Sequence, residues 1–124
     1  MGFLPFAASL NNPTFTGTAT AASLIASNLN VNFGNLDISF AGTGLQVKEG
    51  ANCKQGVAVL VAGSVVVADT AVTATSRIFL TSQADGGTPG FVRVSARTPA
   101  TSFTITSSSG TDTSTVAYEI IEPG

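Results

Sequence analysis

Residues 56–69 read GVAVLVAGSVVVAD, and this stretch decides the fold class. Two Val-rich runs, Gly56–Ala62 and Val65–Asp69, flank a Gly63-Ser64 pair that suits the centre of a type II′ hairpin turn. Both runs are apolar at nearly every position, which is typical of strands that are covered on both faces. Two explanations remain open: two tightly packed sheets, or association with further copies of the chain, which we favour.

Strand signals continue on both sides of this stretch. Six further runs are rich in β-branched or aromatic residues and bounded by turn residues: Asp37–Phe40, Leu45–Glu49, Ser76–Ser82, Phe91–Ala96, Ser102–Thr106 and Thr115–Glu122. Short strands without helical periodicity predict an all-β fold, a small antiparallel β-sandwich of jelly-roll-like form. Residues 85–90 are expected to form a hairpin loop. The phenylalanines expected in the core are Phe33, Phe40, Phe79, Phe91 and Phe103.

The chain of 124 residues is poor in charge and rich in hydroxyl groups. Charged residues make up 10% of it, with a net charge of −2, while 17 Thr and 13 Ser supply its polarity. The sequence has no His, which excludes a Ser-His-Asp triad, and its single Cys, Cys53, excludes an intrachain disulfide. Five basic residues are too few for a usual DNA footprint, and no apolar run reaches the length of a membrane span. We therefore expect a binding or structural protein, not an enzyme, with no cofactor, metal, nucleic-acid or membrane partner.

The composition changes near residue 37. Residues 1–36 contain no charged side chain and no sustained apolar period, so we expect an extended N-terminal arm that docks on a partner or contacts other subunits. Residues 37–124 are expected to form the β-sandwich body. The apolar side chains of the arm are the candidate docking contacts, namely Phe3, Leu4, Phe6 and Phe15.

The acidic residues favour structural roles over catalytic ones. Asp69 and Asp112 stand at strand ends beside Thr, where a carboxylate usually bonds to the backbone of its own turn. Glu119 and Glu122 are three apart in a predicted strand, so they point to opposite faces and cannot pair as acid and base.

Two further sets of side chains are candidate interaction sites. Arginine suits polar pairing across subunits, so the intersubunit candidates are Arg77, Arg93 and Arg97, with Glu119 among their possible partners. The polar loops at 84–90 and 107–113 are candidate receptor-facing elements through Asp85, Gly86, Gly87, Thr88, Ser108 and Ser109.

Residues 44–124 carry an ordered set of longer motifs. They include SRIFLT at 76–81, VSART at 94–98, TSFTITS at 101–107 and a final D-T-S-x-V-A-x-x-I-x-E-P pattern at 112–123. In this order the motifs resemble a small β-domain of tailed-bacteriophage virion surface proteins. The resemblance brings no catalytic residues with it.

The resemblance implies a trimeric protein on the outer surface of the phage particle. With a short arm that ends in apolar residues, the sequence favours a capsid decoration or cement protein, or a head spike, that binds the major capsid protein or another virion protein. The alternative is a tail-fibre or tail-spike tip that binds a host-surface receptor or glycan. In both cases we expect a homotrimer.

Overall fold

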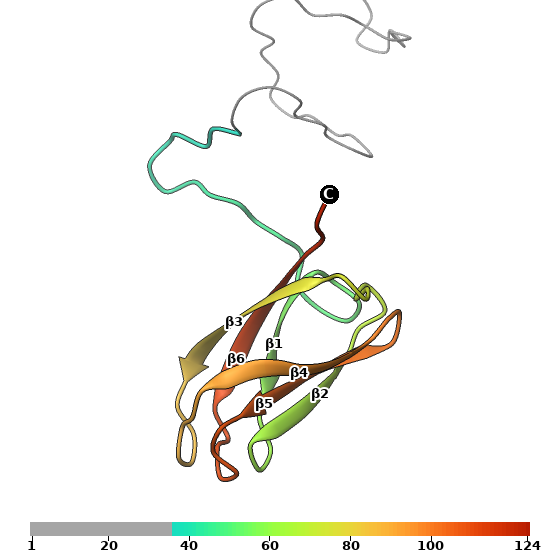
Figure 1. The fold of residues 1–124 in the computed structure, drawn as a ribbon. Coiled ribbons are helices and arrows are strands. Elements are labelled where there is room, and N and C mark those ends of the chain that lie inside the picture. Colours follow the sequence, from blue (N-terminus) through green and yellow to red (C-terminus); the bar gives the residue numbers. More distant parts are fainter. Residues whose placement is uncertain (1–35) are drawn as a thin grey trace, which may run out of the picture. The chain divides into compact units, whose positions relative to one another are not determined.

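The structure is a computed structural model that describes residues 36–124, drawn in Figure 1. The arm-docking candidates Phe3, Leu4, Phe6 and Phe15 lie outside the described residues, as does Phe33. The docking role of the arm and its boundary at residue 36 therefore stay predictions.

Six strands form two antiparallel three-stranded sheets, which confirms the predicted all-β sandwich (Figure 1). We call sheet A the one with the order β1 (Gln55–Val59), β6 (Thr115–Ile121), β3 (Arg77–Ala84). Sheet B has the order β2 (Ser64–Ala68), β5 (Ser102–Ser107), β4 (Val92–Thr98). The chain changes sheet at every connection except the one from β4 to β5.

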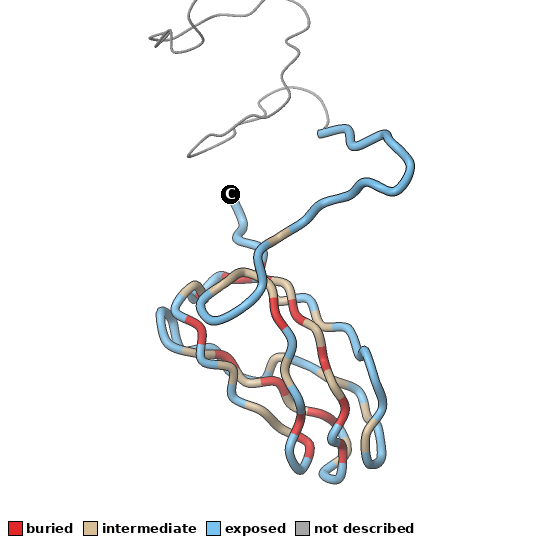
Figure 2. Tube along the Cα trace, turned by 180° about the vertical axis from the view of Figure 1, so that it is seen from behind, coloured by how far each residue is buried: buried red, intermediate tan, exposed pale blue. Residues whose placement is uncertain are grey.

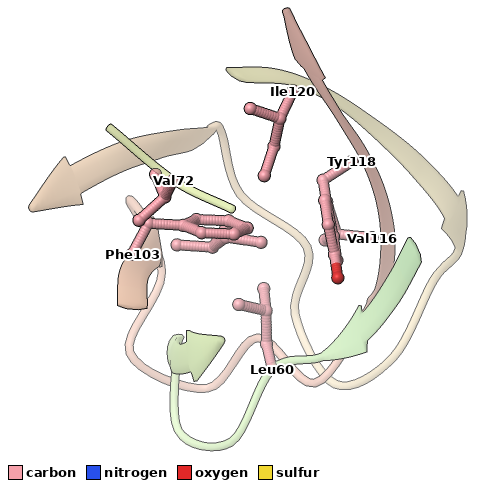
Figure 3. Close-up of a cluster of buried hydrophobic side chains, with 7 residues drawn as sticks. Leu60, Val72, Phe103, Val116, Tyr118 and Ile120 are labelled. Atoms are coloured by element: carbon pink, nitrogen blue, oxygen red, sulfur yellow. The ribbon is translucent and has the colours of Figure 1, made fainter. Parts of the chain in front are cut away.

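The core lies between the two central strands, β5 and β6. Every second residue of each strand is buried, because successive side chains of a strand point to opposite faces. The rings of Phe103 and Tyr118 meet edge to face, with centroids 5.0 Å apart. Figure 3 shows Leu60, Val72 and Ile120 around them, from segments that are distant in the sequence. The predicted inward positions Phe103 and Ile105 are confirmed, at 1% and 0% exposure.

Within residues 36–124, the Val-rich strands β1 and β2 are covered on one face only. Ala58, Val65 and Val67 pack against the core, while Val57 and Val66 stay exposed at 53% and 66%. The tube in Figure 2 shows the same alternation of buried and exposed residues along the strands. No other segment of the described residues therefore covers the second apolar face.

Several sequence-based expectations are wrong. Residues 37–40 and 45–48 have no regular structure, and Glu49 contributes only an isolated bridge to Gln55. Short β-branched runs need a partner strand, and residues 36–48 have none among the described residues. Three of the expected core phenylalanines are exposed instead: Phe40 at 83%, Phe79 at 57% and Phe91 at 87%.

The expected hairpins across 63–64 and 85–90 are corrected as well. β1 and β2 belong to different sheets, as do β3 and β4, so both connections pass from one sheet to the other. The tight turn runs from Val61 to Ser64, with hydrogen bonds of 3.0 and 3.1 Å between their backbones. Its central residues are Ala62 and Gly63, both with positive φ (49° and 80°), which is the type I′ pattern.

Ala62 stands where an Asn or Gly is normally required. Asn tolerates the left-handed conformation better than Ala does, so we expect Ala62→Asn to raise the free energy of unfolding by about 0.5–1 kcal/mol. Urea unfolding of both proteins measures the difference. Ala62→Gly serves as the matched variant, and a loss of stability in both would contradict the type I′ assignment.

Candidate functional site

Three connections meet at one end of the sandwich, the lower end in Figure 1. We call this the loop end, formed by residues 60–63, 85–91 and 108–114. The N–H of Thr113 donates to the carbonyl of Gly86 (2.9 Å), and the N–H of Ser108 donates to the carbonyl of Phe91 (2.9 Å). The predicted receptor-facing segments 84–90 and 107–113 are therefore brought side by side.

Asp112 holds the loop end together. Its carboxylate accepts hydrogen bonds from the Ser107 hydroxyl (2.6 Å), the Ser114 N–H (2.9 Å) and the Gly90 N–H (2.9 Å). Its carbonyl accepts a fourth bond from the N–H of Gly63 (2.9 Å), so one residue joins all three connections. The hydroxyl of Ser107 and the bonds at Ser114 keep the pKa of Asp112 far below its usual range.

The loop end is also closely packed. Gly63 and Gly87 have positive φ, and a Cβ atom on either would collide with a backbone carbonyl of residues 108–114, that of Ser109 or that of Thr111. The exposed side chains of this end therefore stand on a backbone with little freedom. Of the predicted receptor-facing residues, Asp85, Gly87, Thr88 and Ser108 are exposed and Gly86 and Ser109 are half-buried.

The predicted turn roles of the two aspartates are confirmed. Asp69 Oδ1 accepts the N–H of Ala71 (2.8 Å), and Asp112 Oδ1 accepts that of Ser114, each two residues on. Asp69 Oδ2 is buried and has no hydrogen-bond partner within the described part of the chain. Burial first, and then the charge of Asp69, raises the pKa of the Tyr118 hydroxyl, which therefore stays protonated and can donate.

Tyr118 also borders a shallow recess at the edge of β1. The recess has a volume of about 390 Å³ and is lined by Glu49, Gly50, Ala51, Gly56, Val57 and Tyr118. Gly56 makes room for the phenol, because a Cβ there would collide with the Tyr118 hydroxyl. Among residues 36–124 no group of three or more Cys, Asp or Glu side chains is placed to hold a metal ion.

A second polar cluster closes the opposite end of the sandwich. Lys54 Nζ donates to Glu122 Oε1 (2.6 Å) and to the carbonyl of Ala71 (2.6 Å). Glu122 also accepts the hydroxyl hydrogen bonds of Ser76 (2.6 Å) and Thr73 (2.7 Å). These bonds, that from Lys54 first, lower the pKa of Glu122 from 4.5 to about 2. Sequence reasoning missed this cluster, because its members are up to 68 residues apart.

The lowered pKa of Glu122 has a defined consequence for stability. A carboxylate whose pKa falls on folding stabilises the fold above its unfolded pKa, and this stabilisation is lost as the pH falls through the folded pKa. We expect the melting temperatures of wild type and Glu122→Gln to differ most near pH 7 and to converge between pH 4.5 and 2. Thermal melts over this pH range measure the effect. Asp37→Gln, at an exposed position, is the control, and a constant difference at all pH values would contradict the role of Glu122.

The predicted intersubunit residues do not form one cluster. Arg77 and Glu119 lie on the outer face of sheet A, since their register partners Ile121 and Phe79 share that exposed face. Arg93 lies on the outer face of sheet B, opposite Thr106, and Arg97 is exposed on the edge strand β4. Within the described residues none of the three arginines makes an ion pair, and the pair that forms is Lys54 with Glu122.

The two outer faces differ in chemistry. That of sheet A exposes Val57, Val59, Phe79 and Ile121, each at least 46% accessible. That of sheet B carries mostly hydroxyl groups, and three of them form a row across the strands. The Thr106 hydroxyl lies 3.5 Å from that of Ser64 on β2 and 2.7 Å from that of Ser95 on β4.

A small antiparallel β-sandwich with an apolar face, a hydroxyl-rich face and a rigid loop end is thus the class of protein that the structure defines. The family model of the K1 capsule-specific polysaccharide lyase, C-terminal domain, matches residues 52–121, more than half of the chain. The chain belongs to this family. The match fits the predicted phage surface protein and gives no support to capsid decoration.

Other comparisons add nothing to this assignment. No curated protein and no solved structure matches the chain. Within residues 36–124 the structure contains no helix that is long and apolar enough to cross a membrane.

Proposed function

We propose that the chain is a tail component of a phage virion, the tip domain of a tail spike or tail fibre, and that it binds a polysaccharide of the host surface. The observation that carries this proposal is the family match over residues 52–121. The protein that gives the family its name is a phage tail-spike enzyme that acts on a capsule polysaccharide. The tail-tip function was the alternative at the sequence level, and the family favours it over capsid decoration.

Binding, not cleavage, is the activity we propose for this chain. Asp112 and Glu122 are fully engaged in structural hydrogen bonds, and Tyr118 holds its proton, so none of them is available as a base. Incubation with a bound polysaccharide is expected to leave its chain length unchanged. Shortening of the polymer would show that the chain is an enzyme.

The test of the tail function is competition for adsorption. The purified chain, added to host cells before the phage that encodes it, is expected to slow phage adsorption in proportion to the occupied sites. Antibody labelling of the particles in electron micrographs is expected at the tail. Labelling of the head without competition would overturn the proposal in favour of capsid decoration.

We further propose that the chain forms a homotrimer through the outer face of sheet A. This face exposes large apolar side chains, which is costly unless another surface covers them. It also carries Arg77 and Glu119, whose opposite charges can pair between neighbouring copies. Both features fit an arrangement in which the same faces of three copies pack around a threefold axis.

Light scattering tests this assembly. We expect a mass of about 37 kDa, three times the chain mass of 12.4 kDa. Phe79→Glu is expected to give monomers, because it places a carboxylate in the apolar face, whereas Val66→Glu on sheet B is expected to leave the trimer intact. A wild-type monomer at micromolar concentration, or dissociation by Val66→Glu alone, would contradict the proposed interface.

A further inference from the structure

The outer face of sheet B has a chemical character of its own. Nine outward positions follow from the register of β2, β5 and β4, and they are Ser64, Val66, Ala68, Ser102, Thr104, Thr106, Arg93, Ala96 and Thr98. Ser95, at the bulge of β4, is the tenth, because its hydroxyl lies 2.7 Å from that of Thr106. Six of these ten side chains carry a hydroxyl group, one is a guanidinium, and none is a carboxylate. The outer face of sheet A carries both Arg77 and Glu119, one charge of each sign, whereas the outer face of sheet B carries a positive charge and no negative one.

The hydroxyl groups of this face are ordered before any ligand arrives. The Ser64 hydroxyl donates to the carbonyl of Ile105 (3.2 Å), and Thr106 lies within hydrogen-bond distance of both Ser64 and Ser95. The three residues stand on three neighbouring strands, about 4.8 Å apart, so their hydroxyl groups follow one another across the sheet. Such a row offers regularly spaced donors and acceptors to a polymer with many hydroxyl groups.

Phe91 extends the same face at the loop end. It precedes Val92, which packs against the core, so the alternation of the strand turns Phe91 outward beside Arg93. Its N–H donates to the Ser108 hydroxyl (2.9 Å) and its carbonyl accepts the Ser108 N–H (2.9 Å). The preceding Gly90 is held by buried Asp112. A ring that is 87% exposed is thus presented on a fixed backbone, ready to stack against an apolar face of a ligand.

Arg93 indicates the charge of the ligand. It makes no ion pair within the part of the chain that the structure describes, and the outer face around it carries no carboxylate. A guanidinium forms its strongest hydrogen bonds with carboxylates, which it can bind through two parallel N–H groups. The aromatic ring, the hydroxyl groups and the guanidinium together match the C–H faces, hydroxyl groups and carboxylates of an acidic polysaccharide.

We propose that the outer face of sheet B is the binding site for a polysaccharide that carries carboxylate groups, with Phe91 stacking on a sugar ring, Arg93 binding a carboxylate, and Ser95 and Thr106 bonding to sugar hydroxyls. This inference rests on the proposed function, because it names the ligand and the surface that the tail-tip domain uses. It assigns the recognition to this sheet face, whereas the loops at 84–90 and 107–113 form its border.

The experiment uses the full chain and an array of bacterial and animal polysaccharides that contain uronic or sialic acids, each beside its carboxyl-reduced form. We expect wild type to bind at least one acidic polymer, and to bind the reduced form at least about tenfold more weakly. Arg93→Gln and Phe91→Ser are each expected to lower the affinity about tenfold. Added salt is expected to weaken the binding of wild type, because it screens the charge of Arg93. The matched controls, Lys48→Gln and Phe40→Ser, remove one positive charge and one exposed ring outside both sheets, and they are expected to keep the affinity of wild type.

The outcomes separate this inference from the proposed function. Binding to none of the acidic polymers, equal binding to the reduced forms, or unchanged affinity of both sheet B variants would overturn the site. If wild type and both variants still block phage adsorption equally, the tail-tip function stands and the sheet B site is wrong. If the wild-type chain binds an acidic polymer but does not block adsorption, the site stands and the tail-tip function is wrong. Unchanged thermal melts of the variants show that lost binding is not lost folding.

Discussion

Replacing Asp112 with alanine is expected to lower the melting temperature by roughly 10 °C or more. The substitution removes the acceptor of three short hydrogen bonds and leaves the donors of Ser107, Ser114 and Gly90 without a partner in a buried place. Because these donors belong to two different connections, the loop end is expected to loosen as a unit. Amide hydrogen exchange is expected to accelerate throughout residues 85–91 and 108–114.

Asp85→Ala is the matched control, since Asp85 is an exposed aspartate of the same loop end. We expect it to change the melting temperature by no more than about 2 °C. The melting temperature of Asp112→Asn is expected to lie between those of the two alanine variants. The amide oxygen of Asn still accepts hydrogen bonds, while the amide N–H groups face other donors. If Asp112→Ala melted like Asp85→Ala, the three connections would have to be held by their glycine packing alone.

Replacing Phe103 with alanine is expected to lower the free energy of unfolding by about 3–5 kcal/mol. Phe103 is 1% exposed, and its ring packs against Tyr118 of the opposite sheet, so the substitution opens a cavity between the sheets. A domain of this size is stable by about 5–15 kcal/mol, so the loss is a large share of the total.

Chemical unfolding of Phe103→Ala beside Phe91→Ala measures this difference. Phe91 has the same side chain but is 87% exposed, so its loss is expected to cost less than about 0.5 kcal/mol. Phe103→Leu, which is expected to cost about 1.5 kcal/mol, keeps the test informative if the alanine variant does not fold. Equal costs at positions 103 and 91 would contradict the location of the core.

The sequence predicted correctly which face of the central strands is buried. For the neighbouring strands this prediction was poor. In TSFTITS at 101–107 one face is hydroxyl and the other apolar, so Phe103 and Ile105 could be assigned to the core from alternation alone. In β3, and in β4 taken together with the preceding Phe91, both faces contain large apolar residues, so alternation alone does not decide which face is buried. The structure buries the aliphatic set Ile78, Leu80, Val92 and Val94 and exposes Phe79 and Phe91.

The candidate site depended on long-range contacts that no local pattern contains. A turn-forming role could be predicted for Asp112 from its place before Thr113 and Ser114, but not its bond to Gly90, which is 22 residues away. Predicting the outer face of sheet B would also require the strand order. Ser95, Thr106 and Ser64 become neighbours only because β2 and β4 flank β5 in one sheet, and a sequence does not show which strands share a sheet.

The strand order determines how the domain resists a pulling force that acts between two of its parts. β1 runs from the Lys54 end to the turn at Ala62, where the chain continues directly into β2, which pairs with β5 over five residue pairs. A pull applied ahead of β1 and resisted at the loop end acts along the five residue pairs of the β1–β6 ladder and strains its hydrogen bonds together. A pull between Lys54 and Glu122 instead peels β1 from β6 one pair after another. The same domain should thus bear a high load in one direction and open easily in the other.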